Sequence, residues 1–204
     1  MKICITMRLS LESRYLEERD ALSREWFITL QREGIKPYPI PNIVDSPEFY
    51  LDEIKPDALI LSGGDTPGKD IPRDSTETAL LAGAIKRNLP VFGVCRGIQL
   101  INTFFGGTLS KVEGHIGTPH KIDIRPHWHN IYGKRTMVNS FHRDAISVDD
   151  LANGLEIGAT DNDGLIEGLY HPKHPIAAVM WHPEREHAIP EDLDLLRSLI
   201  GEKK

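Results

Sequence analysis

The stretch Pro90-Val-Phe-Gly-Val-Cys-Arg-Gly-Ile-Gln99 decides the fold of this chain. An apolar run from Pro90 to Val94 leads into Cys95, and a helical pattern follows over residues 96–105. A buried strand that turns tightly into a helix is the repeating unit of parallel α/β sheets. Gly93 and Gly97 flank the turn, and the close strand–helix packing of so sharp a turn requires small residues there. The stretch therefore predicts a strand, an elbow at Cys95 and a helix.

The first half of the chain alternates between strand and helix patterns. Leu22, Trp26 and Leu30 recur at the spacing of one helix face, and short apolar runs that end at turn residues indicate strands. This alternation predicts a doubly wound α/β fold, with a mostly parallel central sheet and helices on both faces. The expected strands are 2–7, 36–40, 57–61 and 90–94; the expected helices are 19–32, 73–87 and 96–105, with a proline-rich connection over 37–47.

The second half predicts antiparallel additions to the edge of this sheet. Residues 118–138 contain short alternating segments with proline and histidine, and we interpret 155–170 as two strands around Asp161-Asn-Asp-Gly164. A buried strand over 175–180 and a closing helix over 190–200, with Pro190 near its start, complete the pattern. We find no repeat, low-complexity tract or linker, and therefore expect one domain over residues 1–204.

Composition restricts the class of protein. The chain has 204 residues, of which 40% are hydrophobic and 26% charged, as is ordinary for globular proteins. The net charge of −6 argues against a nucleic-acid partner, and no apolar run reaches the roughly 20 residues of a membrane span. The apolar N-terminus is too brief for a signal peptide and predicts a first strand. Cys4 and Cys95 form no disulfide framework, so we expect a reducing cytoplasmic location.

Cys95 is the candidate nucleophile. The predicted elbow places its thiol at a helix N-terminus, where unpaired N–H groups and the helix dipole favour the thiolate. A buried structural cysteine is the alternative interpretation of this residue taken alone. We interpret Cys4, which lies within a strand and has no glycine neighbours, as structural.

The segment Trp181-His-Pro-Glu184 supplies a candidate base and an acid to orient it. On an extended segment His182 and Glu184 point the same way, and Pro183 stiffens the backbone between them. A surface His-Pro turn is the alternative, since His-Pro also occurs at 171–172 and 174–175. Only His182 follows an apolar strand and precedes an acid. A nucleophile, a base and an orienting acid are the groups that acyl transfer needs.

The glycines of Leu61-Ser-Gly-Gly-Asp65 follow another predicted strand. Backbone N–H groups at such a position can stabilise an oxyanion, each by about 2.7–4 kcal/mol. We expect the amides of Gly64 and Arg96 to form this oxyanion hole, with an ordinary Gly-Gly turn as the alternative. A nucleotide-binding P-loop is excluded because no Gly-Lys-Ser/Thr follows.

Four motifs occur in order along the chain: Gly93–Gln99 with Asn102, Gly106-Gly-Thr-Leu109, Val138-Asn-Ser-Phe-His142 and Trp181–Glu184. Together they resemble the class I glutamine amidotransferase superfamily and, within it, the γ-glutamyl hydrolase branch, peptidase family C26. The resemblance implies a Cys95–His182–Glu184 triad that forms a thioester with the γ-carbonyl of a glutamyl group, which water then hydrolyses, without a cofactor. It also implies that Gln99 and residues 139–142 hold the glutamyl head group. The implied head-group residues are Gln99, Asn139, Ser140, Phe141 and His142.

The loop after Gly64 is shorter than in many γ-glutamyl-aminobutyrate hydrolases and leaves room for a bulky leaving group. Lys69, Arg73 and Arg143 could place cations there, and arginine suits phosphate geometry, although solvated surface charges are the alternative. In length and in these details the chain resembles family members that release glutamate from a γ-glutamyl nucleotide phosphoramidate in capsule biosynthesis.

The expected partners are a small γ-glutamyl substrate and water, with no nucleic acid and no membrane; the sequence leaves the oligomeric state open, a homodimer included. Two other functions stay open: a glutaminase subunit that delivers ammonia to a synthetase, and a γ-glutamyl-aminobutyrate-type hydrolase.

Four histidines lie close together in the sequence at His115, His120, His127 and His129. On a strand, His127 and His129 would share one face. No carboxylate or cysteine grouping completes a familiar ligand set with them. We therefore expect surface or supporting histidines and no metal.

Overall fold

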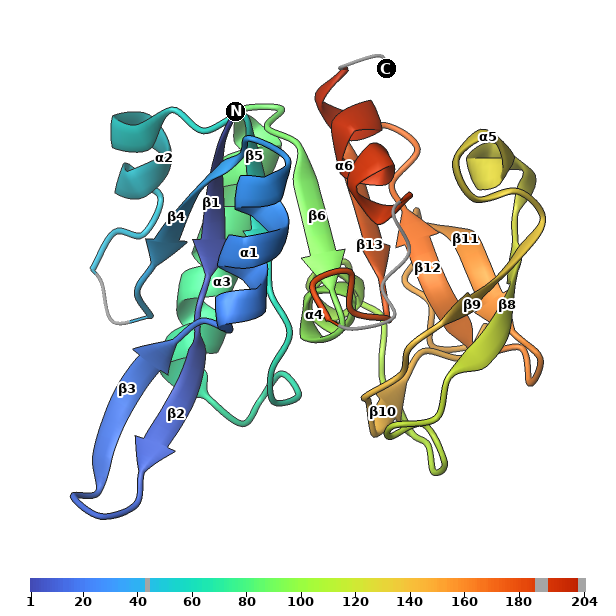
Figure 1. Ribbon diagram of the computed structural model, residues 1–204, viewed down its shortest axis with the longest axis horizontal. Helices are drawn as coiled ribbons and strands as arrows, with labels where there is room; N and C mark the ends of the chain where they lie inside the picture. The colour runs from blue at the N-terminus through green and yellow to red at the C-terminus, as the bar shows by residue number, and fades with distance from the viewer. Residues whose placement is uncertain (43–44, 186–190, 202–204) are drawn as a thin grey trace.

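The computed structural model describes residues 1–42, 45–185 and 191–201. Within them a mixed sheet has the strand order β4-β1-β5-β6-β13-β12-β11-β8-β9 (Figure 1). One half is parallel and consists of β4 (Lys36–Ile40), β1 (Lys2–Thr6), β5 (Ala58–Leu61), β6 (Val91–Val94) and β13 (Ile176–Val179). The other half is antiparallel and consists of β12 (Ile166–Tyr170), β11 (Glu156–Asp161), β8 (His120–Ile124) and β9 (Arg135–Val138). The predicted parallel sheet with antiparallel edge additions is confirmed.

Helices cover both faces of the sheet, as predicted (Figure 1). Helices α1 (Arg24–Arg32) and α6 (Asp192–Ile200) pack on one face; α2 (Phe49–Ile54), α3 (Ile71–Lys86) and α4 (Arg96–Phe104) pack on the other. Strand β1 shows how alternation divides the core: Ile3 and Ile5 point toward α1, whereas Cys4 points toward α3. Burial raises the pKa of the Cys4 thiol to about 12, in agreement with a structural cysteine.

The helix predicted over 19–32 begins only at Arg24. The Ser23 side chain caps it by accepting a hydrogen bond from the Glu25 amide at 3.2 Å. The residues before it instead form a hairpin of β2 (Arg8–Glu12) and β3 (Glu17–Ala21), whose side chains are mostly exposed. Strand β2 has only two apolar residues, Leu9 and Leu11, and β3 is almost entirely charged, so the sequence gives little signal of a strand pair. Helix α2, after the proline-rich connection, was likewise not predicted.

Residues 118–138 contain more than strands. Between β8 and β9 the chain forms a short 3₁₀ helix η1 (Pro126–Trp128) and helix α5 (His129–Tyr132). The expectation that His127 and His129 share a strand face is therefore wrong. The His127 ring stacks on Tyr170, with ring centroids 4.1 Å apart, while His129 Nε2 lies 2.9 Å from the Ile124 carbonyl oxygen. Strands β7 (Ser110–Lys111) and β10 (Asp144–Ala145) pair as a separate antiparallel two-stranded ribbon.

The closing helix α6 is described from Asp192 onward, so the predicted Pro190 start lies outside the described residues. Across those residues, no helix is both long and apolar enough to cross a membrane.

Strands β5, β6 and β13 position the site. They are adjacent and parallel, so their carboxyl ends meet at one edge of the sheet, where α/β proteins bind ligands. The register pairs Val94 with Val179, and the Cys95 amide donates a hydrogen bond to the Val179 carbonyl at 2.9 Å. This pairing brings the segment after β6 beside the segment after β13.

Candidate active site

Cys95 occupies a strained elbow between β6 and α4. Its backbone has φ +52° and ψ −100°, a left-handed conformation that is uncommon outside glycine. The flanking glycines make the elbow possible. A side chain at Gly97 would overlap the Leu61 carbonyl oxygen, and one at Gly93 would lie 2.7 Å from Ile101 Cδ1. The predicted close packing of strand and helix at these glycines is confirmed.

His182 is held in one orientation by three neighbours. Its Nδ1 lies 2.7 Å from Glu184 Oε1, and both side chains are buried. The Asn139 amide bonds the backbone of His182 on both sides, donating to its carbonyl at 2.9 Å and accepting from its amide at 2.8 Å. The edge of the Phe141 ring packs against the imidazole, with ring centroids 5.7 Å apart.

The other side of the His182 imidazole faces Cys95. Burial lowers the pKa of His182, but hydrogen bonds to Cys95 and Glu184 outweigh it and raise the pKa to about 9. The imidazole therefore carries a proton at neutral pH and can stabilise a thiolate. A methyl group at Gly63 would lie 2.7 Å from His182 Cε1 and 3.6 Å from Cys95 Cβ, so the three chain segments converge at one point. A thiol, a base and an orienting carboxylate in this order match the arrangement of an activated nucleophile.

Gly64 and Arg96, the residues expected to form the oxyanion hole, flank this point. Gly64 has φ +154°, and any side chain there would overlap Arg73 Nη1. The first N–H groups of α4 have no partner within the helix, as at every helix start. The direction of the two amides toward a substrate stays a prediction.

A network of buried charges braces the loop after β5 and the elbow. Arg73 Nε lies 2.9 Å from Glu77 Oε1, and the Arg73 Nη2 donates to the Ser62 and Gly63 carbonyls at 2.9 and 3.2 Å. Arg96 pairs with Glu77 and Asp74.

This placement corrects the expectation for Arg73. Its side chain is 1% exposed, so it is neither a cation at the rim of the site nor a solvated surface charge. Burial lowers its pKa to about 10, which still leaves it charged at neutral pH. The signal available in the sequence was the i,i+4 pairing of Arg73 with Glu77 within a largely apolar helix.

The predicted head-group residues come together, but most of their polar groups bind one another. Gln99 Nε2 and His142 Nδ1 both donate to the Asp144 carbonyl, at 3.0 and 3.1 Å. Ser140 Oγ donates to the His115 carbonyl at 2.6 Å. The contact of these residues with a glutamyl head group stays a prediction. The contact of Lys69 and Arg143 with a leaving group also stays a prediction, and both side chains are exposed.

Two arginines that sequence reasoning missed lie at the mouth of the site. Arg8 and Arg185 line a cavity of about 620 Å³ together with Asp65, the residue after Gly64. The Arg185 guanidinium lies over the Phe141 ring, 4.3 Å from its centroid. Arg8 belongs to the unpredicted hairpin, so no local pattern connects it to the site.

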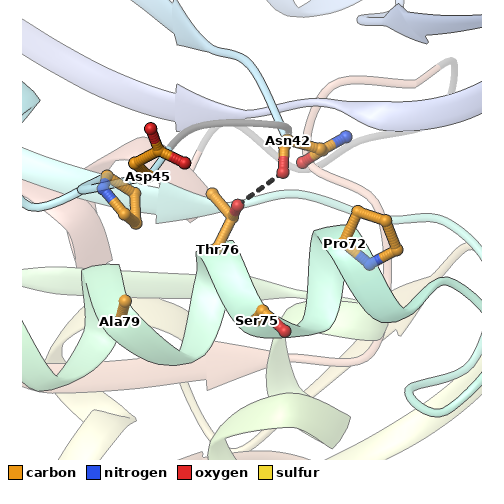
Figure 2. Close-up of a pocket in the computed structure, with 7 residues that line it drawn as sticks. Asn42, Asp45, Pro72, Ser75, Thr76 and Ala79 are labelled. Carbon is orange, nitrogen blue, oxygen red and sulfur yellow. Dashed lines mark hydrogen bonds between the residues drawn. The ribbon is translucent and has the colours of Figure 1, made fainter.

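Another cavity, of about 310 Å³, opens between α3 and the segment after β4 (Figure 2). Thr76 Oγ1 donates to the Asn42 carbonyl at 2.6 Å across it. Its lining includes no residue of the candidate active site.

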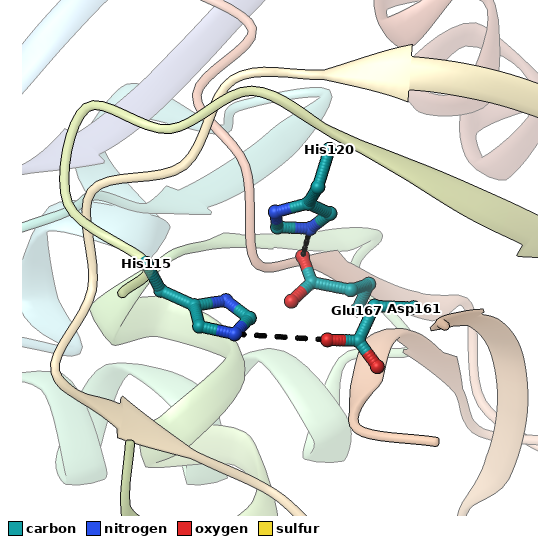
Figure 3. Close-up of side chains that lie close together, drawn as sticks. All are labelled: His115, His120, Asp161 and Glu167. Atoms are coloured by element: carbon teal, nitrogen blue, oxygen red, sulfur yellow. Dashed lines mark ion pairs between the residues drawn. The ribbon is translucent and has the colours of Figure 1, made fainter. Parts of the chain in front are cut away.

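The expectation that no carboxylates accompany the histidines is wrong. Asp161 and Glu167 lie beside His115 and His120 (Figure 3), whereas His127 and His129 lie elsewhere. Burial disfavours the charged form of Glu167, but His120 and His142 outweigh it and lower the pKa to about 2. The strand order β12-β11-β8 brings these residues together, and the sequence alone does not give that order.

The fold and the elbow define a class I glutamine amidotransferase-like protein. The crystal structure of a GMP synthase subunit from Thermoplasma acidophilum superimposes with a TM-score of 0.75 at 25% identity, covering 98% of this chain and 92% of that one. The peptidase C26 family model matches residues 10–184, and the chain belongs to this family. Membership supports a hydrolase acting on glutamine-like amides.

Two relatives align with this chain over very different shares of their length. The gamma-glutamyl-CDP-amidate hydrolase of Campylobacter jejuni is 31% identical over 215 aligned positions, which cover 99% of this chain and 100% of that protein. The glutamine amidotransferase-like protein YvdE of Lactococcus lactis is 37% identical over 127 positions, which cover 55% of this chain and 53% of YvdE. The match thus spans about half the length of YvdE.

Proposed function

We propose that this chain hydrolyses a γ-glutamyl amide, with Cys95 as nucleophile, His182 as acid and base, and Glu184 as the group that orients His182. The Cys95 thiolate attacks the γ-carbonyl carbon. His182 then gives its proton to the leaving nitrogen as the C–N bond breaks, which leaves a thioester. His182 next takes a proton from water, whose oxygen attacks the thioester and releases glutamate and the thiolate. The observation that carries the proposal is the placement of His182 between Cys95 and Glu184.

We propose that the backbone amides of Gly64 and Arg96 stabilise the oxyanion of each tetrahedral intermediate. The buried Arg73–Glu77–Arg96 network supports this role because it holds both backbone segments from behind. A rigid support matters, since preorganised donors need no rearrangement when charge develops.

The proposed substrate is a γ-glutamyl nucleotide phosphoramidate. The similarity to the C. jejuni hydrolase over the whole of both chains supports it. So does the cavity next to Gly64, which Arg8 and Arg185 line, because arginine binds phosphate oxygens well. In this proposal the glutamyl group lies at Cys95 and the nucleotide extends toward the β2–β3 hairpin.

A glutaminase subunit that delivers ammonia to a synthetase is the second candidate function. The similarity to the GMP synthase protein of T. acidophilum favours it. Its chemistry at Cys95 would be the same, with glutamine as the substrate.

A panel of substrates distinguishes the candidates. The purified chain is incubated with glutamine, γ-glutamyl-aminobutyrate and γ-glutamyl-CDP-amidate, and released glutamate is measured by mass spectrometry, with Cys95→Ala as the blank. We expect the nucleotide substrate to turn over fastest without any partner. Turnover of glutamine alone, at a rate that a synthetase stimulates, would establish the glutaminase role instead.

Two arginine variants test the leaving-group site separately. Arg8→Ala and Arg185→Ala should each raise KM for the nucleotide substrate by about 10- to 150-fold, because one charge-assisted contact to phosphate contributes about 1.5–3 kcal/mol. Neither variant should change KM for γ-glutamyl-aminobutyrate. Arg14→Ala, in the exposed turn of the same hairpin, is the matched control. Equal effects of all three variants would contradict this placement of the nucleotide.

A further inference from the structure

Four potential metal ligands converge on the antiparallel half of the sheet. His115 lies in the loop before β8, His120 begins β8, Asp161 ends β11 and Glu167 lies in β12. One ligand atom from each residue can be chosen so that all four lie within 4.8 Å of one another. Figure 3 shows each imidazole pointing toward one of the carboxylates.

Glu167 is a buried carboxylate whose two oxygens face imidazole nitrogens without a well-aligned hydrogen bond. The residue is 1% exposed, and among the described residues neither of its carboxylate oxygens has a hydrogen-bond partner. Two imidazole nitrogens face these oxygens: His142 Nε2 lies 3.3 Å from Oε1, and His120 Nε2 lies 3.5 Å from Oε2. His120 Nε2 also has no hydrogen-bond partner there. Buried polar groups are nearly always satisfied, so these atoms point to a missing ligand between them.

In the second imidazole–carboxylate pair, the Asp161 carboxylate is turned toward the His115 ring. Asp161 Oδ1 accepts hydrogen bonds from the Asp163 and Leu165 amides, at 3.0 and 2.8 Å. Its Oδ2 is thereby turned toward His115 Nε2, at 3.8 Å. Backbone hydrogen bonds of this kind commonly fix the orientation of metal-binding carboxylates.

The spacing agrees with ligands around one ion. Tetrahedral Zn²⁺ bonds of about 2.0–2.1 Å place neighbouring ligand atoms about 3.4 Å apart. The two imidazole–carboxylate distances, 3.5 and 3.8 Å, are close to this value. The most distant pair of ligand atoms, at most 4.8 Å apart, would have to approach by about 1.4 Å. We propose that His115, His120, Asp161 and Glu167 bind a divalent transition-metal ion, with Zn²⁺ as the best match to two imidazoles and two carboxylates.

The chemistry of the site favours a structural ion. The two carboxylates balance the charge of a divalent cation, and imidazole with carboxylate suits Zn²⁺ better than Mg²⁺ or Ca²⁺. All four ligand side chains are at most 17% exposed, which resembles closed structural sites and not catalytic ones. The ion would join β8, β11 and β12 to the loop that carries His115, whose carbonyl accepts the Ser140 hydroxyl. The inference does not depend on the proposed function.

Metal content and spectroscopy of the full chain test the proposal. The chain is purified without chelators or a histidine tag, and its metal content is measured by elemental mass spectrometry. The chelator-treated protein is then titrated with Zn²⁺ against a chromophoric competitor, and with Co²⁺, whose visible absorption reports tetrahedral coordination. We expect about one Zn²⁺ per chain and the Co²⁺ bands of a four-coordinate site.

Ligand variants and a matched control locate the ion. His115→Gln, His120→Gln, Asp161→Asn and Glu167→Gln should each weaken Zn²⁺ binding by at least about 100-fold, since even outer-shell changes cost about 10–100-fold. His127→Gln, an exposed histidine outside the cluster, should bind like wild type. The proposal is overturned if the chelator-treated wild type takes up neither ion, or if the ligand variants bind as tightly as wild type. The wild-type titration decides the matter even where a variant fails to fold.

Discussion

Gly63→Ala should impair catalysis while leaving the protein folded. The added methyl group would lie 2.7 Å from His182 Cε1 and 3.6 Å from Cys95 Cβ. Non-bonded carbon atoms prefer about 3.5 Å or more, so the imidazole must retreat by about 0.8 Å. A displacement of about 1 Å can cost about 100-fold in rate. We therefore expect kcat/KM to fall by about 10- to 100-fold, equivalent to about 1.4–2.7 kcal/mol of lost transition-state stabilisation.

Gly97→Ala is the matched control, because the same chemical change meets a backbone atom there. Its methyl group would overlap the Leu61 carbonyl oxygen, which cannot turn aside as an imidazole can. We expect urea unfolding to show a loss of about 1–3 kcal/mol for Gly97→Ala and little change for Gly63→Ala. Activity is measured as glutamate release from the best substrate of the panel. An unchanged kcat/KM for Gly63→Ala would refute the placement of His182 against Gly63.

Three further predictions concern the thiols, the imidazole and the buried charges. Cys95→Ala should abolish hydrolysis but leave the melting temperature nearly unchanged. In the wild type, iodoacetamide should label Cys95 before Cys4, because the Cys4 thiol is buried and its pKa is raised to about 12. Equal labelling of the two cysteines, measured by peptide mass spectrometry, would contradict this prediction. The pKa of His182 is raised from 6.5 to about 9, so the protonated imidazole contributes stability that is complete below pH 6.5 and is lost as the pH rises through 9. Urea unfolding across that range should show the wild type losing stability relative to His182→Gln. Parallel curves for the two proteins would contradict this prediction. Glu77→Gln removes the buried carboxylate that Arg73 and Arg96 share and leaves Arg73 without its ion-pair partner, so it should cost about 3–5 kcal/mol of unfolding free energy. Glu17→Gln, in an exposed pair, should leave stability unchanged; similar unfolding curves for both variants would refute the buried network.

The sequence predicts the strand–elbow–helix unit well because its local signals agree. The apolar strand, the glycines at 93 and 97 and the helical pattern all require the same turn, and the structure forms it at Cys95. The β2–β3 hairpin was missed because β3 is almost entirely charged and the two apolar residues of β2 are too few to indicate a strand by themselves.

Features that depend on distant residues could not be predicted from the sequence. Arg73 and Glu77 are polar residues on a helix, and polar residues are ordinarily exposed; only the packing of α3 against β1 and α4 buries them. Similarly, Glu167 is far from His120 in the sequence, and its place opposite that ring follows from the strand order of the antiparallel half.

The pairing of Val94 with Val179 has a consequence for how such a protein can diversify. Cys95 directly follows β6, and His182 lies three residues after β13. These two strands are hydrogen-bonded to one another, so their main-chain register, and not a long surface loop, sets the distance between the thiol and the imidazole. Insertions or deletions in the loop over 65–70, or in the hairpin over 8–21, would reshape the space for the departing half of the substrate without disturbing the reacting pair. New specificities can thus arise on this scaffold by changes at its rim alone.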